Sequence, residues 1–202
     1  MEVHCLSVGP LGTNCYIVSS GKDSLVVDPG EDAGEILSVI REKGLSVNAI
    51  IVTHGHFDHY IAAGALQEAL GAPVYTGADD LSALRDPGWM AEYMPPGYIA
   101  PKEIKGLSDG DTVSAGELTF RVISTPGHSP GSVCLYSPGV LLSGDLLFMG
   151  SIGRTDLPGG DSRAIRESLV KVGRLPDDTV VYPGHGPSTT IGEEKASNPY
   201  MD

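Results

Sequence analysis

Basic residues and long apolar runs are scarce in this sequence, and each scarcity excludes a class of protein. Lysine and arginine together number 13 against 26 aspartates and glutamates, so the net charge is −13 at pH 7. A field of this sign repels phosphate backbones and anionic lipids, so we expect neither nucleic acid nor a membrane as a partner. A transmembrane helix requires about 18 consecutive apolar residues, and the sequence has no such run.

Cysteine is also rare, which bears on the cellular compartment. The three residues, Cys5, Cys15 and Cys134, are odd in number and show no CxxC spacing. The first ten residues, MEVHCLSVGP, lack the basic and apolar regions of a secretory signal. Both features fit a reducing compartment, so we expect a cytoplasmic protein. Each cysteine lies in an apolar run, and we predict that each is a buried thiol of the core.

Sequence motifs of several common enzyme classes are absent. The chain has neither the GxGxxG of dinucleotide-binding folds nor a phosphate-binding P-loop. It has no GxSxG, and the SGD at 143–145 is not the nucleophile elbow of a serine hydrolase. The chemistry must therefore come from other side chains.

The first half of the chain alternates short strands with helices. CYIVSS and SLVVDPG flank the turn GKD and predict a hairpin. A helix is expected from Ala33 to a stop at Gly44, and a second at 59–71 with Asp58 as N-cap and Gly71 as stop. VNAIIVT, ending at Thr53, and PVYTG read as buried strands.

The second half has a similar order of elements. Two strands are expected around Ala115-Gly116, two around Pro138-Gly139, and a last one in TVVYPGHG. Residues 161–176 predict a helix with Ser162 as N-cap and with Ile165, Leu169 and Val172 on its apolar face. With 202 residues, 41% of them hydrophobic, we expect one domain over 1–202, an α/β layered fold of two sheets with helices outside.

Five of the six histidines follow directly after predicted strands, beside glycine or proline. The stretch THGHFDHY, residues 53–60, supplies three of them, and STPGH and VVYPGH supply His128 and His185. Asp28 and Asp145 come after two further strands. Loops at one edge of a sheet can converge, so this recurrence predicts a shared metal site. Only His4 lies outside the pattern, and we assign it no role.

The number of candidate ligands favours two metal ions. A hydrolytic zinc site uses about three protein ligands and leaves a place for water, whereas five histidines and two aspartates suggest two metals with one shared carboxylate. His54 and His56 can point to one side together, while Asp58 and His59 can face a neighbouring metal. Two metals about 3.5–4 Å apart can hold a bridging hydroxide that is nucleophilic at neutral pH. Zinc is expected, with iron or manganese as alternatives, because such ligands do not choose among them by affinity.

THGHFDH, PGHS, SGD and PGHG, in this order, resemble the motifs of the metallo-β-lactamase superfamily, and DPG at 28–30 resembles its early aspartate motif. The resemblance spans almost the whole chain. It implies an αββα sandwich, with two mixed β-sheets face to face and a dinuclear site at their loop edges. It also implies a ligand set: His54, His56 and His128 for the first metal, Asp58, His59 and His185 for the second, and Asp145 as the bridge. Asp28 is expected to orient the loops without binding metal.

TNCYIV, SGDLLFMGSIGRTDLPGGD and PGHGPSTTIGEEKASNPY resemble the short bacterial glyoxalase II-like hydrolases. This resemblance implies a small-molecule acyl thioester as substrate, such as S-D-lactoylglutathione, attacked by the bridging hydroxide. Asp58 is the nearest candidate to handle a proton. Full-length glyoxalase II uses a C-terminal helical extension to hold glutathione, and only 17 residues follow His185 here.

Two alternatives stay open. GRTDLPGGD also resembles the persulfide dioxygenases of the same superfamily, which hold one iron by two histidines and an aspartate. Those ligands would correspond to His54, His128 and Asp145. A lactone hydrolase is the second alternative, whereas the ligand pattern departs from common β-lactamase sets, so antibiotic hydrolysis is not expected.

Three further features have two interpretations each. Segment 77–106, with Trp89, Tyr93, Met94 and Tyr98, forms either a roof over the site or core packing between the halves. Arg154 and Asp156 either pair to hold a loop or contact substrate. Lys195 is expected to be a solvated surface residue, with substrate contact as the alternative.

Overall fold

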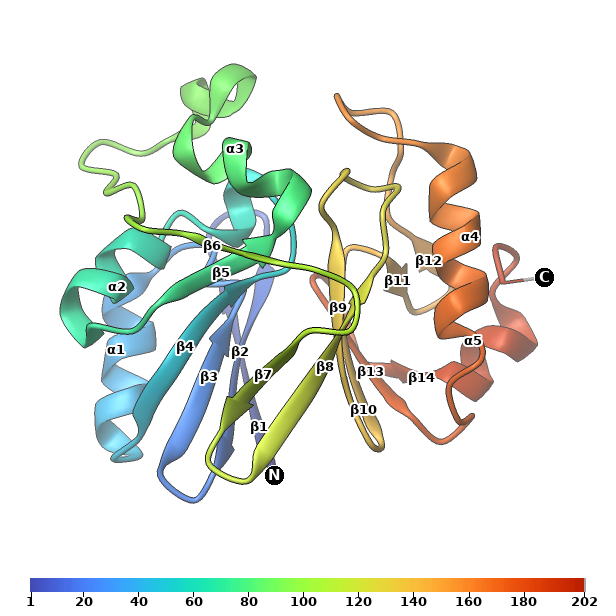
Figure 1. Ribbon diagram of the computed structural model, residues 1–202, viewed down its shortest axis with the longest axis horizontal. Helices are drawn as coiled ribbons and strands as arrows, with labels where there is room; N and C mark the ends of the chain where they lie inside the picture. The colour runs from blue at the N-terminus through green and yellow to red at the C-terminus, as the bar shows by residue number, and fades with distance from the viewer. Residues whose placement is uncertain (202) are drawn as a thin grey trace.

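Continuous burial along the central strands, such as β2 (Thr13–Ser20) and β10 (Val140–Gly144), shows that the sheets are covered on both faces. The computed structural model describes residues 1–201, and these residues form two six-stranded sheets face to face with helices on the outer sides (Figure 1). The predicted αββα sandwich is therefore confirmed. Within the part described, no helix is both long and apolar enough to cross a bilayer.

The first sheet is built by the N-terminal half, in the order β1-β2-β3-β4-β5-β6. Its strands are β1 (Glu2–Val8), β2 (Thr13–Ser20), β3 (Asp23–Val27), β4 (Ser46–Val52), β5 (Val74–Gly77) and β6 (Lys105–Leu107). Its helices are α1 (Ala33–Glu42), α2 (Ala63–Leu70) and the short α3 (Leu81–Arg85). Antiparallel pairing joins β1 to β2 and β2 to β3, and β3 to β6 run parallel, so the sheet is mixed.

The second sheet has the order β14-β13-β10-β9-β8-β7. Its strands are β7 (Thr112–Ala115), β8 (Leu118–Ser124), β9 (Val133–Ser137), β10 (Val140–Gly144), β13 (Val180–Pro183) and β14 (Thr189–Thr190). The remaining elements are the ribbon of β11 (Leu147–Phe148) and β12 (Ser151–Ile152), with the helices α4 (Ser162–Val172) and α5 (Ile191–Ser197). This sheet is also mixed, because β10 and β13 pair in parallel and the others antiparallel.

Three apolar layers hold the sandwich together. Ile17 on one face of β2 packs with Ile36 of α1 in the outer layer, while its neighbour Val18 points into the layer between the sheets. Phe120 of β8 belongs to that middle layer, and Ile165 of α4 to the third, outside the second sheet. Because successive side chains of a strand face opposite ways, both faces of each sheet are apolar and buried.

The direction of the strands decides where the site can form. Strands β8, β10 and β13 run in the same direction, so the loops that follow them leave the second sheet at one edge. The backbone N–H of Val133 donates to the Thr53 carbonyl at 2.9 Å, and Thr13 bridges to His185. These two contacts fasten the loop edge of the first sheet to that of the second.

Most predicted boundaries lie close to the observed ones, and two predicted N-caps are wrong. Helix α2 begins at Ala63 after a 3-10 turn at Phe57–His59, because the Asp58 carboxylate turns away to accept from Thr13 Oγ1. Helix α4 is capped by Asp161 rather than Ser162, since the Asp161 side chain accepts from two backbone N–H groups of the first turn. The stop at Gly71 is confirmed, with the residue in a left-handed conformation at φ 68°.

Other corrections concern the edges of the fold. Cys5 is exposed, because it lies on edge strand β1, whereas Cys15 and Cys134 are buried as expected. TVVYPGHG does not supply the last strand, since β14 and helix α5 follow it. Segment 77–106, interpreted as irregular, contains α3, two 3-10 turns and most of the edge strand β6.

Candidate metal centre

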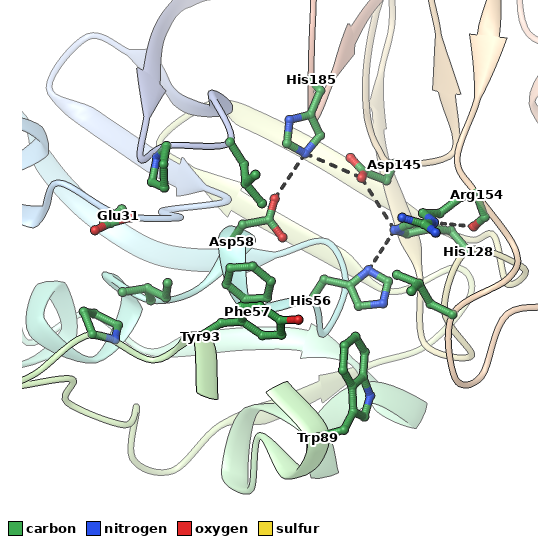
Figure 2. A pocket seen from close by; sticks show the side chains of 15 residues that line it. Glu31, His56, Phe57, Asp58, Trp89, Tyr93, His128, Asp145, Arg154 and His185 are labelled. Carbon is green, nitrogen blue, oxygen red and sulfur yellow. Dashed lines mark hydrogen bonds and ion pairs between the residues drawn. The ribbon is translucent and has the colours of Figure 1, made fainter. Parts of the chain in front are cut away.

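The loops after four strands bring the seven predicted ligands together. The loop after β4 carries four of them, and the loops after β8, β10 and β13 carry one each. Figure 2 shows those that line the cavity, with the side chains of His56, Asp58, His128, Asp145 and His185 gathered on one side of it. The seven residues are His54, His56, Asp58, His59, His128, Asp145 and His185.

His54, His56 and His128 form a first cluster of imidazoles. His128 Nε2 lies 2.8 Å from His56 Nδ1 and 3.2 Å from His54 Nε2, and all three residues are buried. Burial lowers the pKa of His54 well below its usual value and that of His56 to about 4, and the neighbouring imidazoles add to both shifts. Neutral imidazoles with converging lone pairs are the form that binds a metal ion.

Asp58, His59 and His185 form a second, more charged cluster. Asp58 Oδ2 lies 3.2 Å from His185 Nε2 and 3.5 Å from His59 Nε2. Burial alone would raise the pKa of Asp58, but the contact with His185 and the charge of His59 outweigh it and lower the pKa. Asp58 is therefore an anionic oxygen donor beside two nitrogen donors.

Asp145 lies between the two clusters. Its carboxylate is 3.5 Å from His128 Nε2 on one side, and 3.5 Å from His59 Nε2 and 3.6 Å from His185 Nε2 on the other. Within residues 1–201, neither His59 Nε2 nor Asp145 Oδ1 makes a hydrogen bond, although both atoms are buried. Buried polar atoms rarely lack partners, so the residues present fit a bound cation. Asp145 is thus the one carboxylate of residues 1–201 in contact with histidines of both clusters.

The outward nitrogens of two histidines are held by acceptors. Thr53 Oγ1 donates to Asp28 Oδ2 and lies 3.1 Å from His54 Nδ1, and His128 Nδ1 lies 2.8 Å from the Arg154 carbonyl. These contacts place protons on the outer nitrogens, so each Nε2 lone pair faces the centre. His59 Nδ1 lies 3.1 Å from Asp28 Oδ2, a contact at ion-pair distance that lacks the geometry of a hydrogen bond.

Asp28 contacts the loop that carries His54 and His59. Its carboxylate accepts from the Thr53 backbone N–H at 2.7 Å and from Thr53 Oγ1 at 2.8 Å, and it faces the outer nitrogen of His59. Its backbone lies in the left-handed region at φ 52°, which is uncommon for a residue with a side chain. These contacts fit the orienting role expected from the DPG motif.

Asp80 is a positioning residue that the sequence analysis missed. Its buried carboxylate accepts from the backbone N–H of Gly55 at 2.8 Å, from Ser129 Oγ at 2.5 Å and from the backbone N–H of Gly131 at 2.8 Å. It therefore ties the loop of His54 and His56 to the loop of His128. The only sequence signal is the pair Asp79-Asp80 after a strand, which is also typical of an exposed turn.

Asn14 holds the loop of His185 by hydrogen bonds, as Asp80 holds the loop of His128. Its Nδ2 donates to the carbonyls of Pro183 at 2.9 Å and Gly186 at 2.8 Å, and Tyr16 Oη donates to the Pro183 carbonyl at 2.7 Å. The residue belongs to the stretch TNCYIV, which the sequence analysis quoted only for its resemblance. Strand β2 of the first sheet thus holds a loop of the second.

A cavity of about 710 Å³ opens above the two clusters. Trp89 and Tyr93 line it, and Tyr93 stacks on Phe57 with ring centroids 4.7 Å apart (Figure 2). Met94 and Tyr98 of the same segment pack against the outer core layer instead. Trp89 and Tyr93 of segment 77–106 therefore line the cavity, whereas its residues in the apolar core pack outside the first sheet and not between the halves, so the second interpretation is wrong.

Arg154 and Asp156 pair at the rim of the cavity. Two guanidinium nitrogens of Arg154 donate to the two carboxylate oxygens of Asp156, each at 2.7 Å, which matches the pairing interpretation. Lys195 lies on α5 and pairs with Asp177 at 2.7 Å, and it does not line the cavity.

Comparison with known proteins agrees with this geometry. The family model described as "Metallo-beta-lactamase superfamily" matches residues 8–185. The chain is 38% identical to the probable metallo-hydrolase YqgX of Bacillus subtilis, covering 100% of this chain and 98% of that protein. It is 31% identical to the hydroxyacylglutathione hydrolase GloC of Haemophilus influenzae, covering 100% and 99%.

Solved structures give the same picture. BLEG-1 B3 metallo-beta-lactamase is 38% identical with a TM-score of 0.91, covering 99% of each chain. TTHA1623 in a di-iron-bound form is 40% identical with a TM-score of 0.90, covering 98% of this chain and 100% of the other. ETHE1 from Myxococcus xanthus is 29% identical with a TM-score of 0.82, covering 98% and 84%.

Proposed function

Since this chain belongs to the metallo-β-lactamase superfamily, we propose that it is a two-metal hydrolase that cleaves acyl thioesters. The observation that supports this most is the pair of donor clusters joined by Asp145. One cluster of three nitrogens and one of mixed nitrogen and oxygen donors suit two divalent ions that share a carboxylate.

The roles we propose follow the two clusters. His54, His56 and His128 hold the first ion, Asp58, His59 and His185 hold the second, and Asp145 bridges them. A metal pair at such a site supplies a water-derived nucleophile at neutral pH and polarises the substrate carbonyl. We propose zinc as the resident metal, with iron or manganese as alternatives, and the di-iron-bound form of TTHA1623 supports iron in particular.

Asp58 is the residue that we propose for proton handling. It lines the cavity, and Thr13 Oγ1 fixes its carboxylate by donating to Oδ2 at 2.9 Å. In hydrolysis, water adds to the thioester carbon, the carbon–sulfur bond breaks, and a carboxylic acid and a thiol are released. Asp58 can hold the proton of the attacking water and return it to the departing sulfur.

The thioester class is supported by relatives and motifs. GloC, named a hydroxyacylglutathione hydrolase, is similar over its whole length, and the stretches around Asn14, Asp145 and His185 resemble glyoxalase II-like enzymes. The direct test is metal analysis of the native protein, followed by S-D-lactoylglutathione and neutral acyl thioesters on the same sample. We expect two metals per chain and release of free thiol. A lactone and a β-lactam belong in the panel, the latter because BLEG-1 is described as a B3 metallo-beta-lactamase.

An iron dioxygenase acting on glutathione persulfide is the second candidate. His54, His128 and Asp145, the ligands this activity would need, lie side by side, and the chain is similar to the ETHE1 structure. Metal stoichiometry separates the two, with one iron expected for the dioxygenase. A metallated sample that is inert toward every thioester but consumes oxygen with glutathione persulfide would overturn the hydrolase.

The cellular compartment and the partners of the protein are also proposals. The unpaired thiols Cys5, Cys15 and Cys134 fit a reducing cytoplasm, and the acidic charge argues against nucleic acid and anionic membranes as partners. A small molecule is the partner we propose, which is reasonable for a cavity of this size.

A further inference from the structure

The wall of the cavity away from the metal centre is apolar. Leu11, at the β1–β2 turn, faces the cavity together with Phe57, Ile61, Tyr93 and Pro95. Leu11 and Tyr93 are 55% and 48% exposed, so the apolar wall is open to a ligand in the cavity. This wall can take up an apolar part of a substrate beside the reacting carbonyl.

The charges that line the cavity outside the ligand clusters are Glu31 and Arg154, which lie on opposite sides in Figure 2. The Arg154 guanidinium is already paired with Asp156 through two hydrogen bonds. The half-buried Glu31 carboxylate takes part in none of the hydrogen bonds or ion pairs found within residues 1–201. An anion entering on the Glu31 side therefore meets an unneutralised negative charge, and on the other side a cation that has a partner.

The cavity continues on the Glu31 side. A smaller hollow of about 170 Å³ shares Glu31, Ile61 and Pro95 with the main cavity and extends to Tyr98 and Ile99. The residues that line this extension include no lysine, arginine or histidine. A substrate arm that leaves the metal centre along this path meets apolar side chains and two acids, Glu31 and Asp32.

We propose that the substrate is an acyl thioester whose arm is long, apolar and free of carboxylates, and that Glu31 and the wall around it select against carboxylate-bearing carriers such as glutathione. The thioester part rests on the function proposed above. The charge and polarity selection rests on the cavity alone, so it can be tested by binding without turnover.

Trp89 provides the readout, because it lines the cavity and is the only tryptophan of the chain. Metal-loaded protein is titrated with S-hexyl-N-acetylcysteamine, which is uncharged, and with S-hexylglutathione acetylated on its amino group, which carries two carboxylates and no ammonium that could pair with Glu31. Neither thioether can be hydrolysed. We expect the uncharged ligand to bind at least about tenfold more tightly, since one uncompensated charge contact at short range is worth about one order of magnitude in affinity.

Three variants test whether Glu31 and Arg154 cause the preference for the uncharged ligand. Glu31→Gln should raise the affinity for the acetylated S-hexylglutathione several-fold and leave the uncharged ligand unchanged. Asp156→Asn should do the same by freeing Arg154. Glu35→Gln is the matched control, because it makes the same charge change at an exposed acid of the same region that does not line the cavity, and it should leave the ratio unchanged.

The outcomes separate this inference from the proposed function. Equal or tighter binding of the acetylated S-hexylglutathione by the wild type, or no binding of either ligand by equilibrium dialysis, overturns the selection. An equal shift in Glu31→Gln and Glu35→Gln also overturns it, because the effect would then be one of overall charge. Binding as expected together with no hydrolysis of any thioester overturns the proposed function instead.

Discussion

The loops that carry His128 and His185 reach the same centre but are held there differently. Asp80, a buried carboxylate, receives three hydrogen bonds and joins the His128 loop to the loop of His54 and His56. Asn14, a neutral amide, donates two bonds to the His185 loop. Hydrogen bonds to a charged group are about twice as strong as neutral ones, so the His128 loop is the more firmly fixed.

The two ligand clusters also differ, in burial and in charge. The three imidazoles of the first are buried, with 8% exposure at most, whereas the His185 side chain of the second is 29% exposed at the cavity. The first cluster is neutral and enclosed, and the second is charged and opens to the cavity at Asp58 and His185, although its His59 is fully buried. This suggests that the first cluster mainly retains a metal, while the second, with Asp58, faces the substrate.

The largest effect is expected at Asp145, where the two clusters meet. Asp145→Ala removes the carboxylate that lies 3.5–3.6 Å from histidines of both clusters. We expect loss of both metals on dialysis and a fall in hydrolysis greater than the roughly 100-fold found for outer hydrogen-bond partners. Metal analysis and kcat/KM are the measurements. Full activity with both metals retained would show that Asp145 is no bridge.

Asp80→Asn should weaken metal binding at the first cluster only. The amide cannot accept three bonds as the carboxylate does, so metal affinity at the first cluster should fall about 10–100-fold while the second is unchanged. Chelator competition on both sites measures this. The exposed neighbour Asp79 provides the matched control, Asp79→Asn, with no expected effect. If both sites weakened equally and the metal-free protein melted earlier, Asp80 would be only a structural residue.

Asn14→Ala should weaken metal binding at the second cluster, by less than Asp80→Asn weakens it at the first. It removes two neutral hydrogen bonds to the His185 loop, worth about 0.7 kcal/mol each, so we expect roughly a tenfold loss at the second cluster. The same chelator competition applies. Asn48→Ala, which removes a side-chain acceptor for the Ser24 N–H, is the control. A loss at the first cluster as large as at the second would contradict separate support.

The smallest effect is expected far from both loops. Lys195→Ala breaks the exposed pair with Asp177, whose side chains are 44% and 69% exposed. Such pairs contribute about 0–1 kcal/mol, so unfolding in denaturant should shift by no more than this. Both metal sites should be unchanged. A clear change in metal binding would show that α5 influences the centre.

Much of the fold and of the candidate site was predictable from local pattern. Apolar strands that end in a histidine or aspartate beside glycine or proline marked the ligand loops, because loops that follow parallel strands leave a sheet at one edge. The two wrong N-caps had a common cause. Asp58 and Ser162 are good capping residues by type, but a contact with Thr13 engages one and the neighbouring Asp161 takes the place of the other.

Asp80, Asn14 and the role of segment 77–106 could not be predicted in this way. Asp79 and Asp80 are adjacent and chemically identical, yet one is exposed and the other is 3% exposed and accepts three hydrogen bonds. Asn14 acts on residues more than 165 positions away. No local pattern carries information about such distant partners.

The sequence by itself determined which donor types are present and which loops carry them, because ligand chemistry and strand-end position are local properties. Only the tertiary structure decided that these donors divide into an enclosed neutral cluster and an open charged one with Asp145 between them. It also decided that Glu31 faces the cavity without a partner while Arg154 already has one. Those properties depend on burial and on distances between loops of different sheets, which exist only once the two sheets have packed.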